Sequence, residues 1–452
     1  MLASIFAAFA QESPVSVMMR GIMERLFRPE RLDEIFAEHS KLQYERELLF
    51  SSLVNLLSLV VCGIHPSVNA AYKAKAETLN VTRGALYQKL NGVEIDVSAA
   101  LLRETASELG ELIQSMGGQQ IALLPGYAVR ILDGNALAAT EHRLKVLRDV
   151  AAAPLPGKSL VVLDPENQLA VDIFPCEDGH AQERRLFNAV LETVQAAQLW
   201  IADRNMGTLG FLFGIAQRQA AFVIREHQNL PWRAVSELKF IQTVESGELF
   251  EQEIEIEQDG THLTVRRVVL RLFKPTRHDE QEMAFLTNLP SSVATAAVVS
   301  QLYRERWQIE TLFLTVTMNF EGEINTLAYP KAALFSFSLA LVTYNILATI
   351  KASLVSVHGL KKVNEELSDY YVVDEIQGTY RGMMIAIPSE YWQSFGQMTL
   401  TDFVAQLKEL AATVNLKRFL KQPRKKKKTQ QPKRVSDPKH PHVSTAKLLS
   451  PD

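Results

Sequence analysis

The stretch LWIADRNMGTLGFLFGIAQRQAAFVIRE, residues 199–226, places a strand, a helix and a second strand in direct succession. Residues 199–205 form a short apolar run that ends in turn-forming residues, and residues 220–226 form a second such run. Between them, residues 208–219 have the length and composition of a helix. This order is typical of a mixed α/β domain whose sheet is covered on both faces.

The segments that flank this stretch extend the same domain. Three β-rich runs precede it, at residues 128–135, 159–167 and 170–176. Residues 183–198 then show apolar side chains at helical spacing. Residues 227–275 alternate polar and apolar residues and predict a β-rich insertion, after which residues 282–290 predict a final strand.

Helices are expected on either side of the α/β domain. Residues 1–118 predict an N-terminal helical region, residues 119–330 the α/β domain and residues 331–420 a C-terminal helical region. Within the α/β domain, residues 291–320 read as one long helix, with Ser291 or Ser292 as its N-cap.

The segment AYKAKAETLNVTRGALYQKLNG, residues 71–92, follows the plan of a helix-turn-helix. Thr82 is a candidate N-cap of its second helix. In a DNA-binding helix-turn-helix the second helix enters the major groove, so Thr82, Arg83, Tyr87 and Lys89 are candidate DNA contacts. An ordinary helical hairpin is the alternative interpretation.

The composition is that of a folded protein with ample chain to bury a core. The chain has 452 residues, of which 47% are hydrophobic and 22% charged. Two cysteines are too few for a disulfide framework, which favours a reducing, cytoplasmic location. Two 17-residue apolar runs, 48–64 and 334–350, fall short of the roughly 20 residues that span a bilayer, so both predict buried core helices.

Charge is distributed unevenly along the chain. The net charge is −3, yet residues 417–452 hold 12 Lys or Arg and 2 Asp or Glu, which leaves −13 on residues 1–416. Residues 421–452 are therefore expected to be a basic disordered tail, which serves either as an arm for the DNA backbone or as a solubilising tail. Because residues 1–416 are acidic as a whole, any contact of this part of the chain with DNA is expected to be confined to small sites.

Three carboxylates are candidate metal ligands. Asp133 and Asp203 each end a predicted strand, and ligands of open α/β sheets bind at that edge. Glu310 lies in the helix YRERWQIETLFLTVTMNF, residues 303–320. Three converging carboxylates need a neutralising cation, and their hard oxygens select Mg²⁺ or Mn²⁺. Two such ions support attack on a phosphodiester.

Each carboxylate also has a structural alternative. Asp133 precedes Gly134 and would then form a turn. Asp203 would pair with Arg204 on the surface. Glu310 would pair with Arg306, one helical turn away.

The start of this helix resembles a known family. YRERWQIE matches the Y-x2-R-x3-E signature of bacterial DDE transposases of insertion-sequence family four, with Tyr303, Arg306 and Glu310 at its positions. ILDGN and WIADRN are similar to the segments that carry the two catalytic aspartates of that family. The resemblance implies an RNase H-like catalytic domain with two Mg²⁺ ions held by Asp133, Asp203 and Glu310.

The resemblance also implies a function and partners. It implies cut-and-paste DNA transposition, in which a homodimer binds the terminal inverted repeats of the transposon and joins them to target DNA. Tyr303 and Arg306, with Arg304 beside them, would contact the DNA end. The protein is then expected in the bacterial cytoplasm, associated with the nucleoid and not with a membrane.

One position departs from the family pattern. The family has a lysine seven residues after the glutamate, where this chain has Thr317. The alternatives are therefore a catalytically weakened or domesticated DNA-binding protein, or an RNase H-like nuclease without transposition. Trp232, in the predicted insertion, is either a residue that stacks on a displaced base or a buried core residue.

Overall fold

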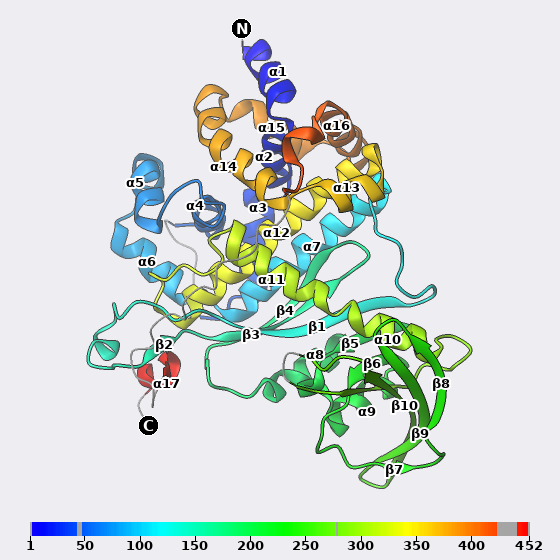
Figure 1. The fold of residues 1–452 in the computed structure, drawn as a ribbon. Coiled ribbons are helices and arrows are strands. Elements are labelled where there is room, and N and C mark those ends of the chain that lie inside the picture. The colour runs from blue at the N-terminus through cyan, green and yellow to red at the C-terminus, as the bar shows by residue number, and fades with distance from the viewer. Residues whose placement is uncertain (1, 43–47, 277–278, 423–440, 451–452) are drawn as a thin grey trace.

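The computed structural model describes residues 2–42, 48–276, 279–422 and 441–450. Its centre is one mixed sheet in the order β4-β3-β1-β5-β6-β11-β10-β9-β7, with β8 paired to β9 (Figure 1). The strands of its first half are β1 (Ala128–Ala136), β3 (Lys158–Asp164), β4 (Leu169–Cys176), β5 (Gln198–Ala202) and β6 (Ala221–Arg225). Those of its second half are β7 (Arg233–Ala234), β8 (Lys239–Val244), β9 (Gly247–Gln258), β10 (Thr261–Leu272) and β11 (Glu282–Thr287).

The first half of the sheet combines antiparallel and parallel strand pairs. β3 pairs antiparallel with both β4 and β1, whereas β5 pairs parallel with β1 and β6 pairs parallel with β5. The helix α9 (Leu209–Gln217) connects β5 to β6, which confirms the strand–helix–strand order of that stretch. The predicted mixed α/β class is therefore confirmed.

Helices cover the sheet on both faces because successive strand residues point to opposite sides. In β1, Ile131 packs into the larger core with α7 (Ile95–Met116) and α12 (Pro330–His358). The next residue, Leu132, packs into a smaller core with α8 (Phe187–Thr193) and α9. Figure 1 shows α7, α11 and α12 on one side of the sheet and α8 and α9 on the other.

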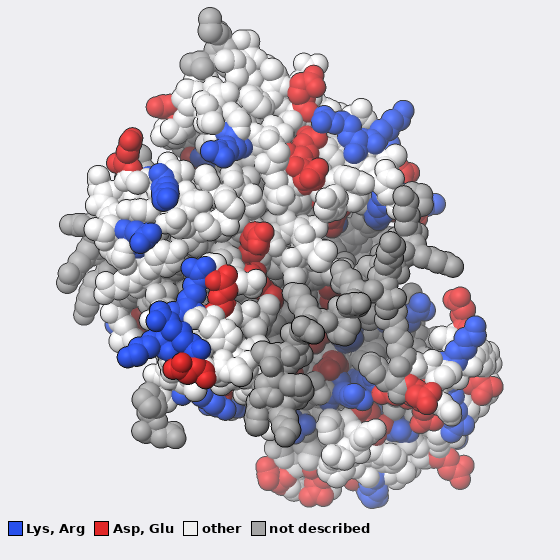
Figure 2. Space-filling model, turned by 60° about the vertical axis from the view of Figure 1, so that its left-hand side comes forward, with Lys and Arg blue, Asp and Glu red and all other residues white. Residues whose placement is uncertain are grey.

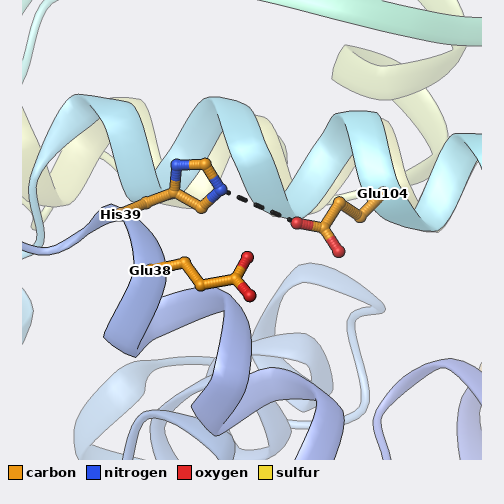
Figure 3. A group of neighbouring side chains, drawn as sticks. All are labelled: Glu38, His39 and Glu104. Carbon is orange, nitrogen blue, oxygen red and sulfur yellow. Dashed lines mark ion pairs between the residues drawn. The ribbon is translucent and has the colours of Figure 1, made fainter.

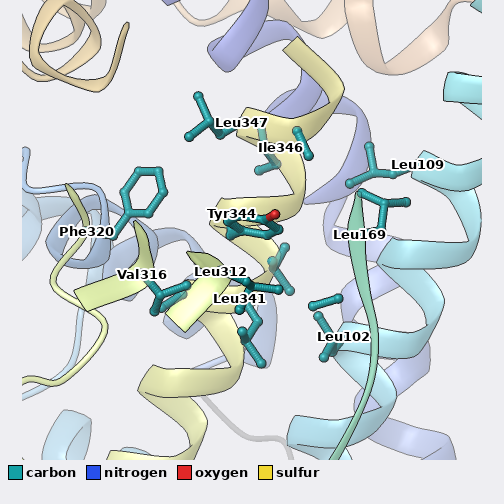
Figure 4. Packing of buried hydrophobic residues seen from close by; sticks show 14 of the residues in the cluster. Leu102, Leu109, Leu169, Leu312, Val316, Phe320, Leu341, Tyr344, Ile346 and Leu347 are labelled. Atoms are coloured by element: carbon teal, nitrogen blue, oxygen red, sulfur yellow. The ribbon is translucent and has the colours of Figure 1, made fainter. Parts of the chain in front are cut away.

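The long helix α12 is the centre of the larger core. Of the described helices, it alone is long and apolar enough to cross a membrane, and 94% of its apolar window is buried inside the molecule. Figure 4 shows Leu341 and Tyr344 of α12 between Leu312 of α11 and Leu102 of α7. The other apolar run lies in α4 (Phe50–Val61), most of which is also buried. Both runs are core helices, as predicted.

The terminal helices form one body. The N-terminal helices are α1 (Leu2–Glu12), α2 (Pro14–Leu26), α3 (Pro29–His39), α4, α5 (Val68–Leu79), α6 (Arg83–Gly92) and α7. The C-terminal helices are α12, α13 (Leu360–Glu366), α14 (Asp369–Ala386), α15 (Glu390–Gln397) and α16 (Leu400–Thr413). Because α2 packs against α12, α14, α15 and α16, the two predicted helical regions share a core.

The predicted β-rich insertion contains strands, as expected, but they belong to the main sheet. β11 pairs with β6, and β10 pairs with β11, so the long β9–β10 hairpin continues the central sheet outward. The register across this junction sets Phe285 of β11 opposite Arg225 of β6. The hairpin therefore extends the sheet of the domain that it interrupts.

Two other expectations are corrected. Residues 291–320 are two helices, α10 (Ala296–Arg304) and α11 (Trp307–Asn319), and Thr295 caps the first of them. The predicted disordered tail, 421–452, is ordered in part: β12 (His442–Ser444) pairs with β2 (Ala153–Leu155), and α17 (Thr445–Leu449) follows. The rest of that prediction, residues 423–440, lies outside the described residues.

Candidate active site

The parallel register of β1 and β5 brings two aspartates side by side. Leu132 pairs with Ala202 at the end of the ladder, so Asp133 and Asp203 are the next residue on each strand. Neighbouring strands lie about 4.8 Å apart. Both aspartates follow the side-chain alternation of Ile131 and Ile201, which face the larger core. They therefore emerge at one point of the sheet edge, on the side covered by α11.

The local roles of the two aspartates differ from the structural alternatives. Asp133 is not in a turn, because β1 continues to Ala136 and Asp133 lies opposite Val161 of β3. Asp203 does not pair with Arg204, whose guanidinium instead lies 3.2 Å from Glu280. Asp203 accepts a hydrogen bond from the Asn205 N–H and caps a short 3₁₀ turn.

Glu310 reaches the same point from α11, which packs on β1. The Arg306 guanidinium connects the two elements: Nη1 lies 2.6 Å from Oδ2 of Asp133, and Nη2 lies 2.5 Å from Oε1 of Glu310. The predicted Arg306–Glu310 ion pair is thus present, and it is part of a three-residue bridge. The bridge fixes Glu310 beside Asp133 across 177 sequence positions, the difference between their numbers.

The electrostatics of the site centre on Asp133. Burial raises its pKa to about 6, although the charge of Arg306 and the N–H of Gly134 oppose the shift. The negative charges of Asp203 and Glu310 raise the pKa of Asp133 further, which shows that all three carboxylates share one electrostatic environment. The cluster therefore carries more negative charge than one guanidinium neutralises.

Tyr303 forms the wall next to Arg306. Its ring packs at 4.6 Å from the ring of Phe285, and the Arg306 guanidinium carbon lies 5.9 Å from the Tyr303 ring. Burial raises the pKa of the Tyr303 hydroxyl, which therefore stays protonated at neutral pH and can donate a hydrogen bond. Tyr303, Arg306 and Glu310 are thus brought together, whereas Arg304 is exposed to solvent.

The part of the chain that holds the three carboxylates matches a known protein family. The family described as "Transposase DDE domain" matches residues 128–346, which contain all three carboxylates. Residues 128–346 form a transposase DDE domain. The piggyBac transposase synaptic complex with hairpin DNA, solved by cryo-electron microscopy, is similar in structure, with a TM-score of 0.39 and 9% identity over 88% of this chain and 86% of that chain. No curated protein matches the chain.

A fourth carboxylate of the DDE domain was not predicted from the sequence. Glu183 precedes α8, and its Oε1 lies where a side chain at Gly134 would be, 2.3 Å from an ideal Cβ position. Burial raises the pKa of Glu183, and the charge of Asp203 adds to the shift. A side chain at position 134 would therefore displace the Glu183 carboxylate from its present place beside β1. The sequence held no signal for this, because Glu183 belongs to an ordinary helix start.

Two further positions of the DDE domain were singled out in the sequence. Thr317, which replaces the family lysine, is exposed, and its hydroxyl donates to the Phe313 carbonyl oxygen within the helix. Trp232 is 38% exposed, so the expectation of a buried core tryptophan is wrong. Its indole N–H donates to Glu226, and the Arg267 guanidinium lies 5.2 Å from its ring.

A different cluster lies outside the DDE domain. Glu38, His39 and Glu104 are the one group in the described part of the chain whose metal-ligand atoms all lie within 4.8 Å of one another (Figure 3). Arg31 already pairs with Glu104, and His39 lies 3.7 Å from the same carboxylate. Asp133, Asp203 and Glu310 are not a group with this spacing among the described residues, and the Arg306 guanidinium contacts both Asp133 and Glu310.

The predicted helix-turn-helix has the expected backbone. α5 ends at Asn80, which has a left-handed conformation with φ of 48°, and the Thr82 hydroxyl caps α6 by accepting from the Ala85 N–H. Lys89 lies 4.0 Å over the ring of Phe36, and Tyr87 is half-buried. Of the four candidate DNA contacts, Thr82 and Arg83 are exposed, and the Arg83 guanidinium lies 3.5 Å from the Asn69 side chain.

Proposed function

We propose that this chain is a bacterial insertion-sequence transposase that cuts and joins DNA with divalent metal ions. One observation carries the proposal: within a transposase DDE domain, the β1–β5 register sets Asp133 beside Asp203, and Arg306 ties Glu310 to Asp133. This arrangement is the one expected of three carboxylates that act on one phosphodiester.

The donor set fits a hard divalent cation. Three carboxylates lie near one sheet edge, and burial, together with the charges of Asp203 and Glu310, raises the pKa of Asp133 in spite of Arg306. Oxygen donors of this kind select Mg²⁺ or Mn²⁺ over softer metals. Asp133, Asp203 and Glu310 would hold two ions, which when bound activate the attacking oxygen and stabilise the leaving oxygen.

The remaining residues of the site would position the DNA. Arg306 can release its carboxylates to the cations and bind a phosphate in a bidentate manner. The Tyr303 hydroxyl, which stays protonated, would donate to a neighbouring phosphate oxygen. Both roles would hold the scissile phosphate beside the three carboxylates.

The DNA partner is proposed to be double-stranded DNA that carries the terminal inverted repeats. On the face in Figure 2, the basic and acidic side chains of the described residues lie in separate small groups. Contact is therefore expected at local sites, which include the exposed Arg83 of the helix-turn-helix and the exposed Arg304. Two copies of the chain would pair the two ends during cut-and-paste transposition.

The test uses the full-length protein, Mg²⁺ and a plasmid carrying the inverted repeats that flank its reading frame. Glu310→Gln is expected to slow cleavage by about 10³-fold, a loss of about 4 kcal/mol of transition-state stabilisation, and to leave DNA binding unchanged. Glu305→Gln is the matched control, because Glu305 lies in the turn between α10 and α11 and its carboxylate accepts a hydrogen bond from the Gln308 side chain. That variant should cleave at the wild-type rate.

The products separate the alternatives. A wild-type protein that binds the ends without cutting them would be a domesticated DNA-binding protein, and one that cuts without joining ends to target DNA would be a nuclease. If Glu310→Gln cleaves as fast as the wild type, the carboxylate assignment is wrong.

A further inference from the structure

A cleft of about 750 Å³ lies in the helical body, outside the DDE domain. Its walls come from α2, from α4 and the loop after it, from α5 and from α14 with the residues that follow it. No residue that lines it belongs to the range 128–346. A cleft of this size is typical of sites for small molecules.

Positive charge is concentrated in this cleft. Arg20 of α2, Lys75 of α5 and Arg381 of α14 line it, and the His65 imidazole of the α4–α5 loop, whose lowered pKa leaves it neutral at neutral pH, lies among them. Glu24 is the one acidic residue of the lining, and it already pairs with Arg20. Within the described chain, Arg381 has no ion-pair partner. The lining thus has an excess of cationic groups on a protein body that is acidic as a whole.

The cationic groups lie close enough to act on one another. Burial lowers the pKa of His65, and the charges of Arg381 and Lys75 lower it further. Burial also lowers the pKa of Lys75, and the charge of Arg20 adds to that effect. Like charges held together in this way disfavour one another, and a bound anion would offset the repulsion.

The rest of the lining is largely apolar. Met23 and Phe27 of α2 and Leu56 and Leu59 of α4 line the cleft together with Met384 of α14. The cleft therefore combines a cationic cluster with an apolar wall, which suits a ligand that has a charged end and a flat apolar body.

We propose that this cleft binds a phosphate-bearing ligand of nucleotide size. Arg381 and Lys75 would contact the phosphate, since guanidinium and ammonium groups are the usual protein partners of phosphate. The base would lie against the apolar wall. The phosphate comes either from a free nucleotide or from a nucleotide unit of a DNA strand, and the two sources share the same chemistry.

The test measures the affinity of the full-length protein for ADP with a fluorescent label on its ribose. Arg381→Gln and Lys75→Gln are each expected to weaken binding about tenfold, because each removes one charge-assisted contact. Lys73→Gln is the matched control: Lys73 is an exposed lysine of α5 outside the lining, and its loss should leave the affinity unchanged. Thermal unfolding of each variant verifies that it is folded.

The outcomes decide both the site and the source. Unlabelled adenosine should compete far more weakly than ADP, and displacement of the label by a single-stranded oligonucleotide assigns the source to DNA, whereas failure to displace it assigns a free nucleotide. Asp133→Asn should keep full affinity even though it loses cleavage, which separates this site from the catalytic one. No saturable binding, or equal affinity in Arg381→Gln, Lys75→Gln and the wild type, would overturn the proposal.

Discussion

At the scale of one residue, the buried carboxylate of Asp133 opposes the stability of the fold. Its raised pKa of about 6 means that the folded protein binds a proton more tightly than the unfolded chain, where the pKa is about 3.9. Between these values the folded state holds more protons, so its stability is greatest at low pH and falls as the pH rises from about 4 to about 6. Above that range the charged carboxylate destabilises the fold.

Asp133→Asn removes this charge. In metal-free buffer at pH 7 the variant is expected to be more stable than the wild type by on the order of 2 kcal/mol, and the difference should vanish near pH 4. Urea unfolding at both pH values measures it. Asp149→Asn, at an exposed position, serves as the control and should show no such gain. A gain that is the same at both pH values would contradict the assigned cause.

At the scale of elements, the hydrophobic periodicity of the sequence predicted most strands and core helices. It failed at residues 305–309, where the predicted single helix divides into α10 and α11. There the N–H groups of Arg306 and Ile309 donate to carbonyl oxygens only three residues earlier, which tightens the chain. No proline or glycine marks this division, so the local pattern held no signal for it. Arg306, at the division, is the residue that bridges to the sheet.

The edge strand β4 depends on one polar residue of α12. Asn345 is fully buried, and its amide both donates to the Ala170 carbonyl oxygen and accepts from the Ala170 N–H, at 2.8 Å each. β4 has no neighbouring strand at this edge, so the Asn345 amide supplies the two hydrogen bonds that such a strand would have made to Ala170. The register between β3 and β4 also shifts here, after Val162.

Asn345→Ala leaves both Ala170 groups buried without partners and opens a small cavity. The free energy of unfolding is expected to fall by about 3 kcal/mol, as measured by urea unfolding. Thr349→Val is the control on the same helix, because the Thr349 hydroxyl bonds only to its own helix. It should cost less than about 1 kcal/mol. If both variants lose the same free energy of unfolding, the hydrogen bonds between Asn345 and β4 do not contribute more to stability than a bond within α12.

At the scale of the whole molecule, the sequence predicted the order of the helices and strands along the chain, but not which distant segments pack together. The carboxylates Asp133, Asp203 and Glu310 could be named because each stands in a local motif. Glu183 could not, because its approach to Gly134 depends on the packing of α8 against the sheet. The shared core of α2 with α14 and α16 was also invisible, since it joins segments that lie more than 300 residues apart in the sequence.

The described C-terminal segment ties the chain back to the α/β domain. β12 pairs parallel with β2, and the Ala153 N–H donates to the Pro441 carbonyl oxygen at 3.0 Å. Ser444 and Thr445 are buried there. Removal of residues 441–452 should therefore expose the Ala153 amide and raise its hydrogen-exchange rate by at least about tenfold, because local opening governs exchange.

The same truncation should change the melting temperature little, since β2 and β12 form a two-stranded sheet apart from the central one. Lys447→Ala is the control: it removes only the exposed ion pair with Asp178, at 3.4 Å, and surface ion pairs contribute little to stability. Exchange at Ala153 should then stay within about twofold of the wild type. If the truncated chain protects Ala153 as well as the full chain, β12 is not what orders β2.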